Sequence, residues 1–488
     1  EDGIRDTSVT GVQTCALPIY CIPAPSASSH QRPKPMNSPT DRDFWFLPLG
    51  GCGEIGMNLN LFGHDHHWLM VDCGITFNAD LNPTRVELPD PAFAINLGDS
   101  LAGIVLTHAH EDHIGALPYL YERLGSPTLY ATPFTAGVIR EKFRYVSIDP
   151  DLVILKPQCA MTLGPFTITP LPITHSIPET QALLIETAVG NLLHTADWKI
   201  DDNPVVGPPF ERDQFSTPNL PPIDVVLCDS TNALSPGHSK SEQLVQMGLE
   251  RLIRRCEGRV IVSCFASNIA RIQSIGRVAK RTERHLALTG RALERMTRIA
   301  KQCGYLGSDF PLISSHELAH FPPRHALFVA TGSQGEPGAM LSKLASDRHP
   351  DFEIHADDVF IFSSKTIPGN EEPIERLVQQ ITAKGATVYQ AEQFPDLNLH
   401  ASGHPNQSEL ADLYTTVQPK LVVPLHGETR HLTANADVAK AAGIHRTLTG
   451  GNGDLFSLVE PFRVRRNWGH AGRWAVIQDG KALEPVTA

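Results

Sequence analysis

Residues 107–115 read THAHEDHIG and place four potential metal ligands within six positions. They directly follow the apolar run 101–106 (LAGIVL), whose composition predicts a buried strand. Imidazole suits zinc, and a carboxylate can hold a second ion or bridge two. A cluster at a strand end is fixed on one side and open on the other, which favours a catalytic metal over a His-rich surface loop. The candidate ligands are His108, His110, Asp112 and His113.

The composition indicates a globular protein. The chain has 488 residues, of which 41% are hydrophobic and 19% charged, enough for two or three domains. It has no apolar run long enough to span a bilayer, so we expect no membrane contact. Its nine cysteines include no Cys-x-x-Cys pair, which predicts buried free thiols in a reducing cytoplasm rather than a cysteine zinc site.

Residues 1–35 differ from the remainder of the chain. They are rich in Pro and Ser and show no periodicity. They also lack the basic start and apolar core of a signal peptide. We predict a disordered or artefactual extension here, with the natural start at Met36.

The remaining sequence alternates short strands and helices, which predicts an α/β fold. A helix is expected near 114–124, a hairpin over 182–195 and a loop over the proline-rich stretch 203–222. Strand–helix alternation then predicts a parallel sheet and a second domain. Its expected strands are 260–263, 286–289, 327–330 and 359–362, and its expected helices are 268–282, 291–302 and 372–384.

The charge distribution leaves two interpretations open. A net charge of −12 argues against a nucleic-acid partner. Residues 251–301, however, hold thirteen Lys or Arg against three Glu. Such a basic zone can grip a polyanion locally, although solvated helix faces would have the same composition.

Further polar residues end apolar strands along the chain: His175, Asp197, Asp229 and His426. One such residue alone is more often a hydrogen-bonded group than a ligand. The series is harder to dismiss, because an open sheet aligns its strand ends along one rim. Asp72, which ends the strand predicted at 68–71, is expected to orient a ligand histidine.

The ligand count fits two metal ions. Two cations about 3.5–4 Å apart can clamp both oxygens of a phosphodiester displacement and activate a water. We expect two Zn²⁺, with Mn²⁺ as the alternative because it accepts similar ligands. The first predicted set is His108, His110 and His175, the second is Asp112, His113 and His426, and Asp197 bridges them.

These residues together resemble the metallo-β-lactamase fold, and the insertion between Asp197 and His426 resembles a β-CASP domain. Further motifs are similar to those of the ribonuclease J family, from about Phe46 to Phe456. The bare His-x-His-x-Asp-His motif would indicate only the superfamily. The additional motifs are 49–58 (LGGCGEIGMN), 174–178 (THSIP), 229–232 (DSTN), 265–268 (FASN), 331–337 (TGSQGEP), 367–371 (IPGNE), 400–404 (HASGH) and 424–428 (PLHGE).

The resemblance implies an αββα sandwich with an inserted β-CASP α/β domain containing a parallel sheet. It also implies that the family's C-terminal domain is cut short, which leaves a homodimer open. The expected parts are 36–232 and 396–456 for the sandwich, 233–395 for the insertion and 457–488 for a short tail.

The implied activity is that of a zinc-dependent ribonuclease with 5′-to-3′ exonuclease and endonuclease action in RNA maturation and decay. The expected partner is RNA, as a 5′-monophosphorylated single strand. The alternatives are a DNA-directed β-CASP nuclease, a small-ester hydrolase and a non-catalytic RNA-binding scaffold. The long insertion counts against a small-ester enzyme, and the complete ligand set counts against a silent scaffold.

The resemblance also assigns site residues. His404 is expected to protonate the leaving oxygen while Asp229 holds its ring, beside Asp112 and Asp197 as catalytic carboxylates. Phe265 is either a base-stacking or a core residue. The run 463–466 (RVRR) is expected to be a solvated tail, and 64–67 (HDHH) a hairpin turn without metal. The expected substrate contacts are Ser230, Asn232, Phe265, Asn268, Ser333, His400, Ser402 and Gly403, with Ser230 and the Ser402 and Gly403 amides holding a phosphate.

Overall fold

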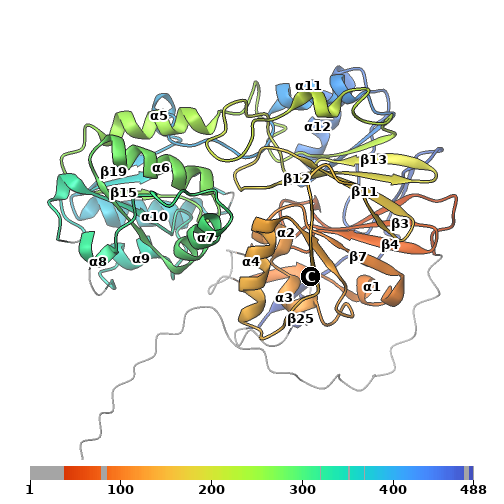
Figure 1. Cartoon of the computed structure of the whole chain (residues 1–488), viewed down its shortest axis with the longest axis horizontal. Coiled ribbons are helices and arrows are strands. Elements are labelled where there is room, and N and C mark those ends of the chain that lie inside the picture. Colours follow the sequence, from red (N-terminus) through yellow and green to blue (C-terminus); the bar gives the residue numbers. More distant parts are fainter. Residues whose placement is uncertain are drawn as a thin grey trace, which may run out of the picture.

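The computed structural model describes residues 38–78, 85–318, 320–349, 352–367, 369–477 and 483–486. The extension predicted over 1–35 and the start predicted at Met36 lie outside these ranges. Two lobes stand side by side (Figure 1): one is built from both ends of the described chain, and the other from its middle, drawn in green to cyan.

The larger lobe contains two packed sheets. The first runs in the order β23-β22-β1-β3-β4-β7-β8-β9, antiparallel from β23 to β4 and parallel from β4 to β9. Its strands are β23 (Arg463–Arg465), β22 (Leu455–Ser457), β1 (Trp45–Gly50), β3 (Leu59–His64), β4 (His67–Val71), β7 (Leu101–Val105), β8 (Leu129–Ala131) and β9 (Leu152–Ile154).

The second sheet runs in the order β10-β11-β12-β13-β14-β20. The predicted hairpin is confirmed as β12–β13, and β13, β14 and β20 are parallel. Parallel strands end at one edge, so the residues that follow these strands are brought together. The strands are β10 (Met161–Leu163), β11 (Phe166–Pro172), β12 (Gln181–Thr187), β13 (Gly190–His194), β14 (Val225–Asp229) and β20 (Leu421–Leu425).

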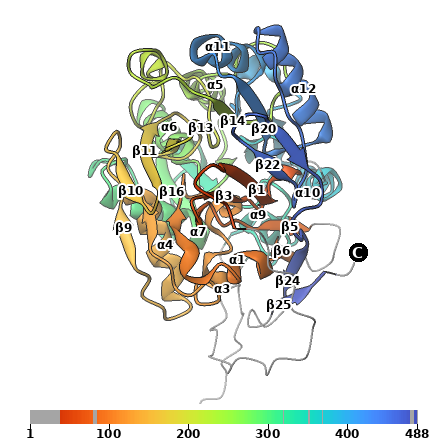
Figure 2. The same ribbon diagram turned by 90° about the vertical axis from the view of Figure 1, so that its right-hand side faces the viewer.

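Alternating side chains of β1 explain the layers. Phe46 packs between the two sheets, whereas its neighbour Leu47 packs under the outer helices, and both are fully buried. Each such side chain contributes about 1.5–3 kcal/mol through burial. Helices therefore cover both outer faces, as Figure 2 shows, and the lobe is the predicted αββα sandwich. The helices are α1 (Ala92–Ile95), α2 (Glu111–Ile114), α3 (Leu117–Leu120) and α4 (Pro133–Arg144) on one side, and α11 (Gln407–Val417) and α12 (Thr429–Ala441) on the other.

The inserted lobe has a parallel sheet in the order β16-β17-β15-β18-β19, as the strand–helix alternation predicted. Its inner strands β15, β17 and β18 are nearly continuous apolar runs because helices cover both faces, whereas the edge strand β19 is polar at both ends and half-buried. The elements are β15 (Val260–Ser263), β16 (His285–Thr289), β17 (Ala326–Ala330), β18 (Val359–Phe362), β19 (Thr387–Gln390), α5 (Glu242–Ile253), α6 (Ile269–Arg281), α7 (Arg291–Gln302), α8 (Ser315–Leu318), α9 (Met340–Ala345) and α10 (Glu371–Ala383).

Shorter elements complete the chain. Two small sheets have the orders β2-β21 and β25-β24-β6-β5. The first joins the glycine-rich loop after β1 to the residues after His426. The remaining elements are β2 (Cys52–Gly53), β5 (Thr76–Asn78), β6 (Arg85–Pro89), β21 (Gly427–Glu428), β24 (Arg473–Val476), β25 (Leu483–Pro485) and the 3₁₀ turns Gly98–Ser100, Arg212–Phe215, Pro323–His325 and Pro395–Leu397.

Two local predictions need correction. The single helix expected near 114–124 is instead the pair α2 and α3, because the Ala116 amide donates to the Cys73 carbonyl (3.0 Å) and Pro118 starts a new turn. The arginines of 463–466 are solvent-exposed as predicted, but the run is not a tail: β23 pairs with β22, and Arg466 forms an ion pair with Asp454 at 2.6 Å.

Of two other predictions, one is confirmed and one holds in part. His64 and His67 close the β3–β4 hairpin, and Asp65 and His66 at its turn have positive φ. The prediction of buried free thiols holds in part: the described cysteines are free, but Cys256 and Cys303 are half-buried and Cys159 is exposed. Among the helices of the described ranges, none combines the length and hydropathy that crossing a bilayer requires.

Candidate metal centre

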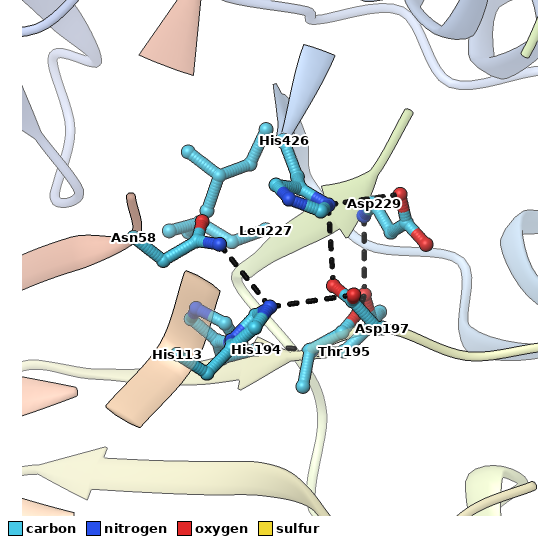
Figure 3. A pocket seen from close by; sticks show the side chains of 10 residues that line it. Asn58, His113, His194, Thr195, Asp197, Leu227, Asp229 and His426 are labelled. Atoms are coloured by element: carbon cyan, nitrogen blue, oxygen red, sulfur yellow. Dashed lines mark hydrogen bonds and ion pairs between the residues drawn. The ribbon is translucent and has the colours of Figure 1, made fainter. Parts of the chain in front are cut away.

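The predicted ligands meet at one rim of the sandwich. His108 and His110 follow β7, and Asp112 and His113 lie on α2. The remaining three each follow a strand of the second sheet. Figure 3 shows His113, Asp197 and His426 converging beside a cavity of about 10 Å³, with Asp229 behind them. These three are His175 after β11, Asp197 after β13 and His426 after β20.

In the first ligand set, the three histidines bring one ring nitrogen each close together. His110 Nδ1 lies 3.0 Å from His108 Nε2 and 3.2 Å from His175 Nε2. The opposite nitrogens are engaged by the protein: His108 Nδ1 contacts the Thr107 hydroxyl (3.0 Å), and His175 Nδ1 donates to the Gly403 carbonyl (2.6 Å). These contacts turn the other nitrogens toward a shared centre.

The second set lies beside the first. His113 Nε2 is 3.6 Å from Asp112 Oδ2, and His426 Nε2 is 3.3 Å from the same oxygen. Asp197 reaches both sets, because its Oδ2 lies 3.3 Å from His113 Nε2 and 3.8 Å from His108 Nε2. Within each set, the potential ligand atoms, including one from Asp197, all lie within 4.8 Å of one another.

Burial and mutual repulsion keep the first set neutral. Burial, with the neighbouring His113 and His110, holds the pKa of His108 well below its ordinary value. Burial and the nearby His110 and His404 do the same for the pKa of His175. Burial lowers the pKa of His110 to about 4 against the opposing effect of two carboxylates. Neutral imidazole is the form that binds a metal.

In the second set, the carboxylates favour the protonated form of the histidines. Burial disfavours the charged form of His113, but Asp197, Asp112 and Asp72 outweigh it and raise its pKa well above the ordinary value. Burial likewise disfavours the charged form of Asp197, yet the surrounding histidines hold its pKa well below the usual range. Proton and cation therefore compete for the second set.

The residues present fit divalent metal ions. Three neutral nitrogens facing one point are a donor set for zinc, and the mixed carboxylate–imidazole set suits zinc or manganese. A carboxylate reaching both sets has the place of a bridging ligand. Without a metal, the charges of Asp112 and Asp197 are matched by protons on His113 and His426, whose pKa values are raised, and a bound cation would take the place of those protons.

Asp72 has the orienting geometry that its position predicted. Its carboxylate accepts from the Thr107 amide (2.9 Å) and from His113 Nδ1 (2.8 Å), and the residue is fully buried. This contact fixes the His113 ring with Nε2 toward Asp197.

His404 stands at the edge of the second set. Its Nδ1 lies 2.8 Å from Asp229 Oδ2, and its side chain is 21% exposed, whereas those of His108, His113, His175 and His426 are 5% exposed or less. Burial opposes the charged form of His404, but Asp229 and Asp197 raise its pKa. Asp229 is held by the Thr231 amide (2.8 Å). His404 is thus protonated more readily than a free histidine and faces outward.

Four of the eight predicted substrate residues use their side chains in hydrogen bonds within the protein. Ser230 Oγ is fully buried and bonded to the Cys228 carbonyl (3.3 Å), and Asn268 caps α6 by accepting from the Arg271 amide (2.8 Å), so these side chains are used within the fold. Asn232 Nδ2 donates to Ser402 Oγ (2.8 Å), which shapes the 400–404 loop.

The other four lie around this loop or the inserted sheet. Gly403 is needed for space, because an added Cβ would lie 2.6 Å from the His175 ring. Within the described residues, the buried His400 Nδ1 has no hydrogen-bond partner. Ser333 is buried, and Phe265 is half-buried outside the core clusters of the described residues, so stacking and packing both stay open for it.

The basic zone predicted at 251–301 is partly paired, because six of its thirteen Lys or Arg side chains form ion pairs. The Arg284 guanidinium is half-buried against backbone carbonyls, including that of Gly258 at 2.9 Å. Ion pairing therefore reduces the number of free cations in the zone, while the choice between a polyanion-binding surface and solvated helix faces stays open. Ion pairs join Arg254 and Arg281 to Glu250, Arg259 to Asp358, Arg271 to Glu242, Lys280 to Asp309 and Arg298 to Glu141.

Some residues of the site were not predicted. The Thr231 hydroxyl donates to Asp229 (2.7 Å) and lies 3.1 Å from His426 Nδ1, so it links the two. Asn435 Nδ2 donates to the Asp229 carbonyl (3.1 Å) from α12. His194 Nδ1 accepts from the Ala196 amide (3.0 Å) beside the cavity of Figure 3. Thr231 lies in the motif 229–232 (DSTN), so the resemblance of that motif to the family could have pointed to it.

Family comparisons agree with this geometry. A beta-lactamase superfamily domain matches residues 67–255, a ribonuclease J beta-CASP domain matches 257–381, and a Zn-dependent metallo-hydrolase RNA specificity domain matches 398–447. A ribonuclease J from Sinorhizobium meliloti is 39% identical over 426 residues, covering 86% of this chain and 75% of the relative. The chain belongs to the ribonuclease J family.

Other relatives give the same picture. Ribonuclease J from Mycolicibacterium smegmatis is 39% identical over 81% of this chain and 71% of its own length, and that from Mycobacterium tuberculosis is 37% identical with the same coverage. A crystal structure of a protein of unknown function from Enterococcus faecalis superposes with a TM-score of 0.60 at 14% identity, covering 85% of this chain and 100% of its own, which supports the fold alone. The predicted metallo-β-lactamase fold with an inserted β-CASP domain is confirmed.

Proposed function

We propose that this chain hydrolyses RNA phosphodiesters with two divalent ions, zinc or manganese, held at the rim. The observation that carries the proposal is the convergence of two ligand sets on one shared carboxylate, Asp197, with the His404–Asp229 pair beside them. Family membership supplies the substrate class. Ions bound there would neutralise phosphate charge and acidify a water.

The chain's own residues would orient and protonate the substrate. His404, with a raised pKa and an outward-facing ring, donates a proton to the leaving oxygen. Asp229 keeps that ring in place through Nδ1, and Thr231 keeps Asp229 in place. The Ser402 and Gly403 amides and His400 are proposed to receive a phosphate, with Phe265 stacking on a base.

The finer activity follows the family resemblance. We propose 5′-to-3′ exonuclease and endonuclease action on single-stranded RNA with a 5′-monophosphate, in the cytoplasm, by a chain that can pair as a homodimer. The domain limits 36–232, 233–395, 396–456 and 457–488 remain part of the proposal.

The test compares substrates under one condition. Purified protein is incubated with 5′-monophosphorylated RNA, matching DNA, and RNA plus chelator, with Zn²⁺ or Mn²⁺ supplied. We expect RNA to be cleaved, DNA to survive and chelator to stop the reaction. Intact RNA would reject the proposal, and preferential cleavage of DNA would replace it with the DNA-directed alternative.

A further inference from the structure

The loop between β11 and β12 carries His175 and is closed at its base. The Ile173 amide donates to the Thr180 carbonyl at 3.1 Å. Within the loop, His175 is fixed through Nδ1 to Gly403 and points Nε2 toward His110. The position of this loop therefore sets where one nitrogen of the first ligand set lies.

Glu179 joins this loop to two other parts of the molecule. Its Oε2 accepts from the Phe134 amide (2.7 Å) in the first turn of α4, where a carboxylate is favoured. Its Oε1 accepts from the Tyr305 hydroxyl (2.8 Å), which follows α7 in the inserted lobe. Glu179 has a φ of 61°, a conformation that non-glycine residues seldom adopt unless their surroundings impose it.

The same region is where the two lobes pack. Figure 1 shows α4 and α7 facing each other across the junction. Gly137 allows a close approach, since an added Cβ would lie 2.8 Å from Ile299 Cγ2. The Phe134 and Tyr305 rings meet edge to face at 6.2 Å, and the Arg298–Glu141 pair (2.8 Å) lies on the exposed margin.

Glu179 differs from these packing contacts because it is continuous with the His175 loop. Any shift of α7 against α4 breaks the Tyr305 hydrogen bond and frees a carboxylate four residues from a candidate ligand. Burial and the Glu179 carboxylate raise the pKa of Tyr305, so its hydroxyl remains a donor.

We propose that Glu179 is a positioning residue that couples the seating of the inserted lobe to the placement of His175. The inference deepens the proposed function by adding control of that site, and it rests on it for the role of the ions. The metal centre is then sensitive to contacts made on the other lobe, through the Tyr305 hydroxyl.

The decisive variant is Tyr305→Phe, which removes a single hydroxyl. The full chain is stripped with chelator and titrated with Zn²⁺ alone, and kcat and KM are measured on bis(p-nitrophenyl) phosphate, a diester too small to need an RNA channel. We expect Zn²⁺ affinity and kcat to fall about tenfold each, the size of one hydrogen bond to a charged group, with KM nearly unchanged.

Arg298→Ala is the matched control. It breaks an exposed pair in the same junction without touching Glu179 and should stay within about twofold of the parent in both measurements. A loss equal to that of Tyr305→Phe would mean that docking of the lobes in general, rather than Glu179, matters, and would overturn the proposal.

Glu179→Gln supplies a second variant. Its amide offers one acceptor oxygen to two donors, so it should reproduce the defect, and combining it with Tyr305→Phe should add little further loss. Wild-type Zn²⁺ affinity in both single variants would refute the coupling. A parent protein that leaves RNA intact, while the Zn²⁺ results hold, would reject the proposed function and leave the coupling standing.

Discussion

At the scale of single residues, His404 and His110 test different parts of the site. His404 contacts Asp229 and is partly exposed, and its ring also lies in a third possible ligand group with Asp197, Asp229 and His426. We expect His404→Ala to slow RNA cleavage about 100-fold or more while bound metal stays at the parent level. Single-turnover kinetics and elemental analysis on the same preparation measure the two quantities. Equal loss of both would make His404 a ligand instead.

His110→Ala should show the converse pattern. Its Nδ1 lies 3.0 and 3.2 Å from the nitrogens of His108 and His175, so truncation removes the middle of the first set. We expect metal content to fall by one ion per chain and turnover to be abolished, with circular dichroism unchanged. A variant that keeps full activity would show that the ligand assignment is wrong.

His113 separates the two ligand sets in their response to acid. Carboxylates raise its pKa well above the ordinary value, so below that pKa a cation must displace its proton, and the affinity of the second set falls about tenfold per pH unit. The first set, whose His110 has a pKa of about 4, should lose affinity only at much lower pH.

Metal content after dialysis at stepwise lower pH measures this order. We expect one ion to leave before the other, with His113→Gln abolishing the early step. Simultaneous release of both ions, or release of the first-set ion before the second, would contradict it.

At the scale of elements, the buried pair Arg271–Glu242 ties α6 to α5. Arg271 is fully buried and also donates to Ser363 after β18 and to the Leu399 carbonyl. Arg271→Ala leaves a buried carboxylate unpaired and should lower the free energy of unfolding by about 3–5 kcal/mol. Denaturant unfolding measures it, with the exposed pair variant Arg254→Ala expected to cost about 0–1 kcal/mol. Equal effects would mean that the Arg271 environment is solvated.

Elements were predictable where local sequence decides them. The inner strands of the inserted lobe are nearly continuous apolar runs bounded by turns, and such runs are visible without the fold. β24 was not predictable, because its partner β6 lies nearly a whole chain length away. The break between α2 and α3 depends on a tertiary hydrogen bond from Ala116 to Cys73.

At the scale of the whole molecule, the convergence of the candidate ligands was predictable, because few residue types can bind a metal and strand ends bring these residues to one rim. Thr231 and Asn435 were not, since hydroxyl and amide groups hydrogen-bond everywhere and only the fold brings α12 beside Asp229. The role of the basic zone could not be decided from the sequence either, because composition gives the number of charges and only the fold decides which of them form ion pairs.

That pairing makes a prediction about RNA binding. With six of the thirteen basic side chains of 251–301 in ion pairs and a net charge of −12, at most seven cations of this zone are free to displace counterions from a phosphate backbone. For single strands the salt slope is about −0.7 per phosphate contact, so we expect a slope no steeper than about −5, the value for seven contacts, rather than the −9 that thirteen contacts would give.

The slope is measured by equilibrium binding of 5′-monophosphorylated RNA to His404→Ala, which keeps its metal while cleaving slowly. Arg254→Gln serves as the control: because Arg254 is paired with Glu250, its loss should leave the slope unchanged. A slope steeper than about −5, or one that flattens in Arg254→Gln, would mean that the ion pairs open and the basic zone grips RNA after all.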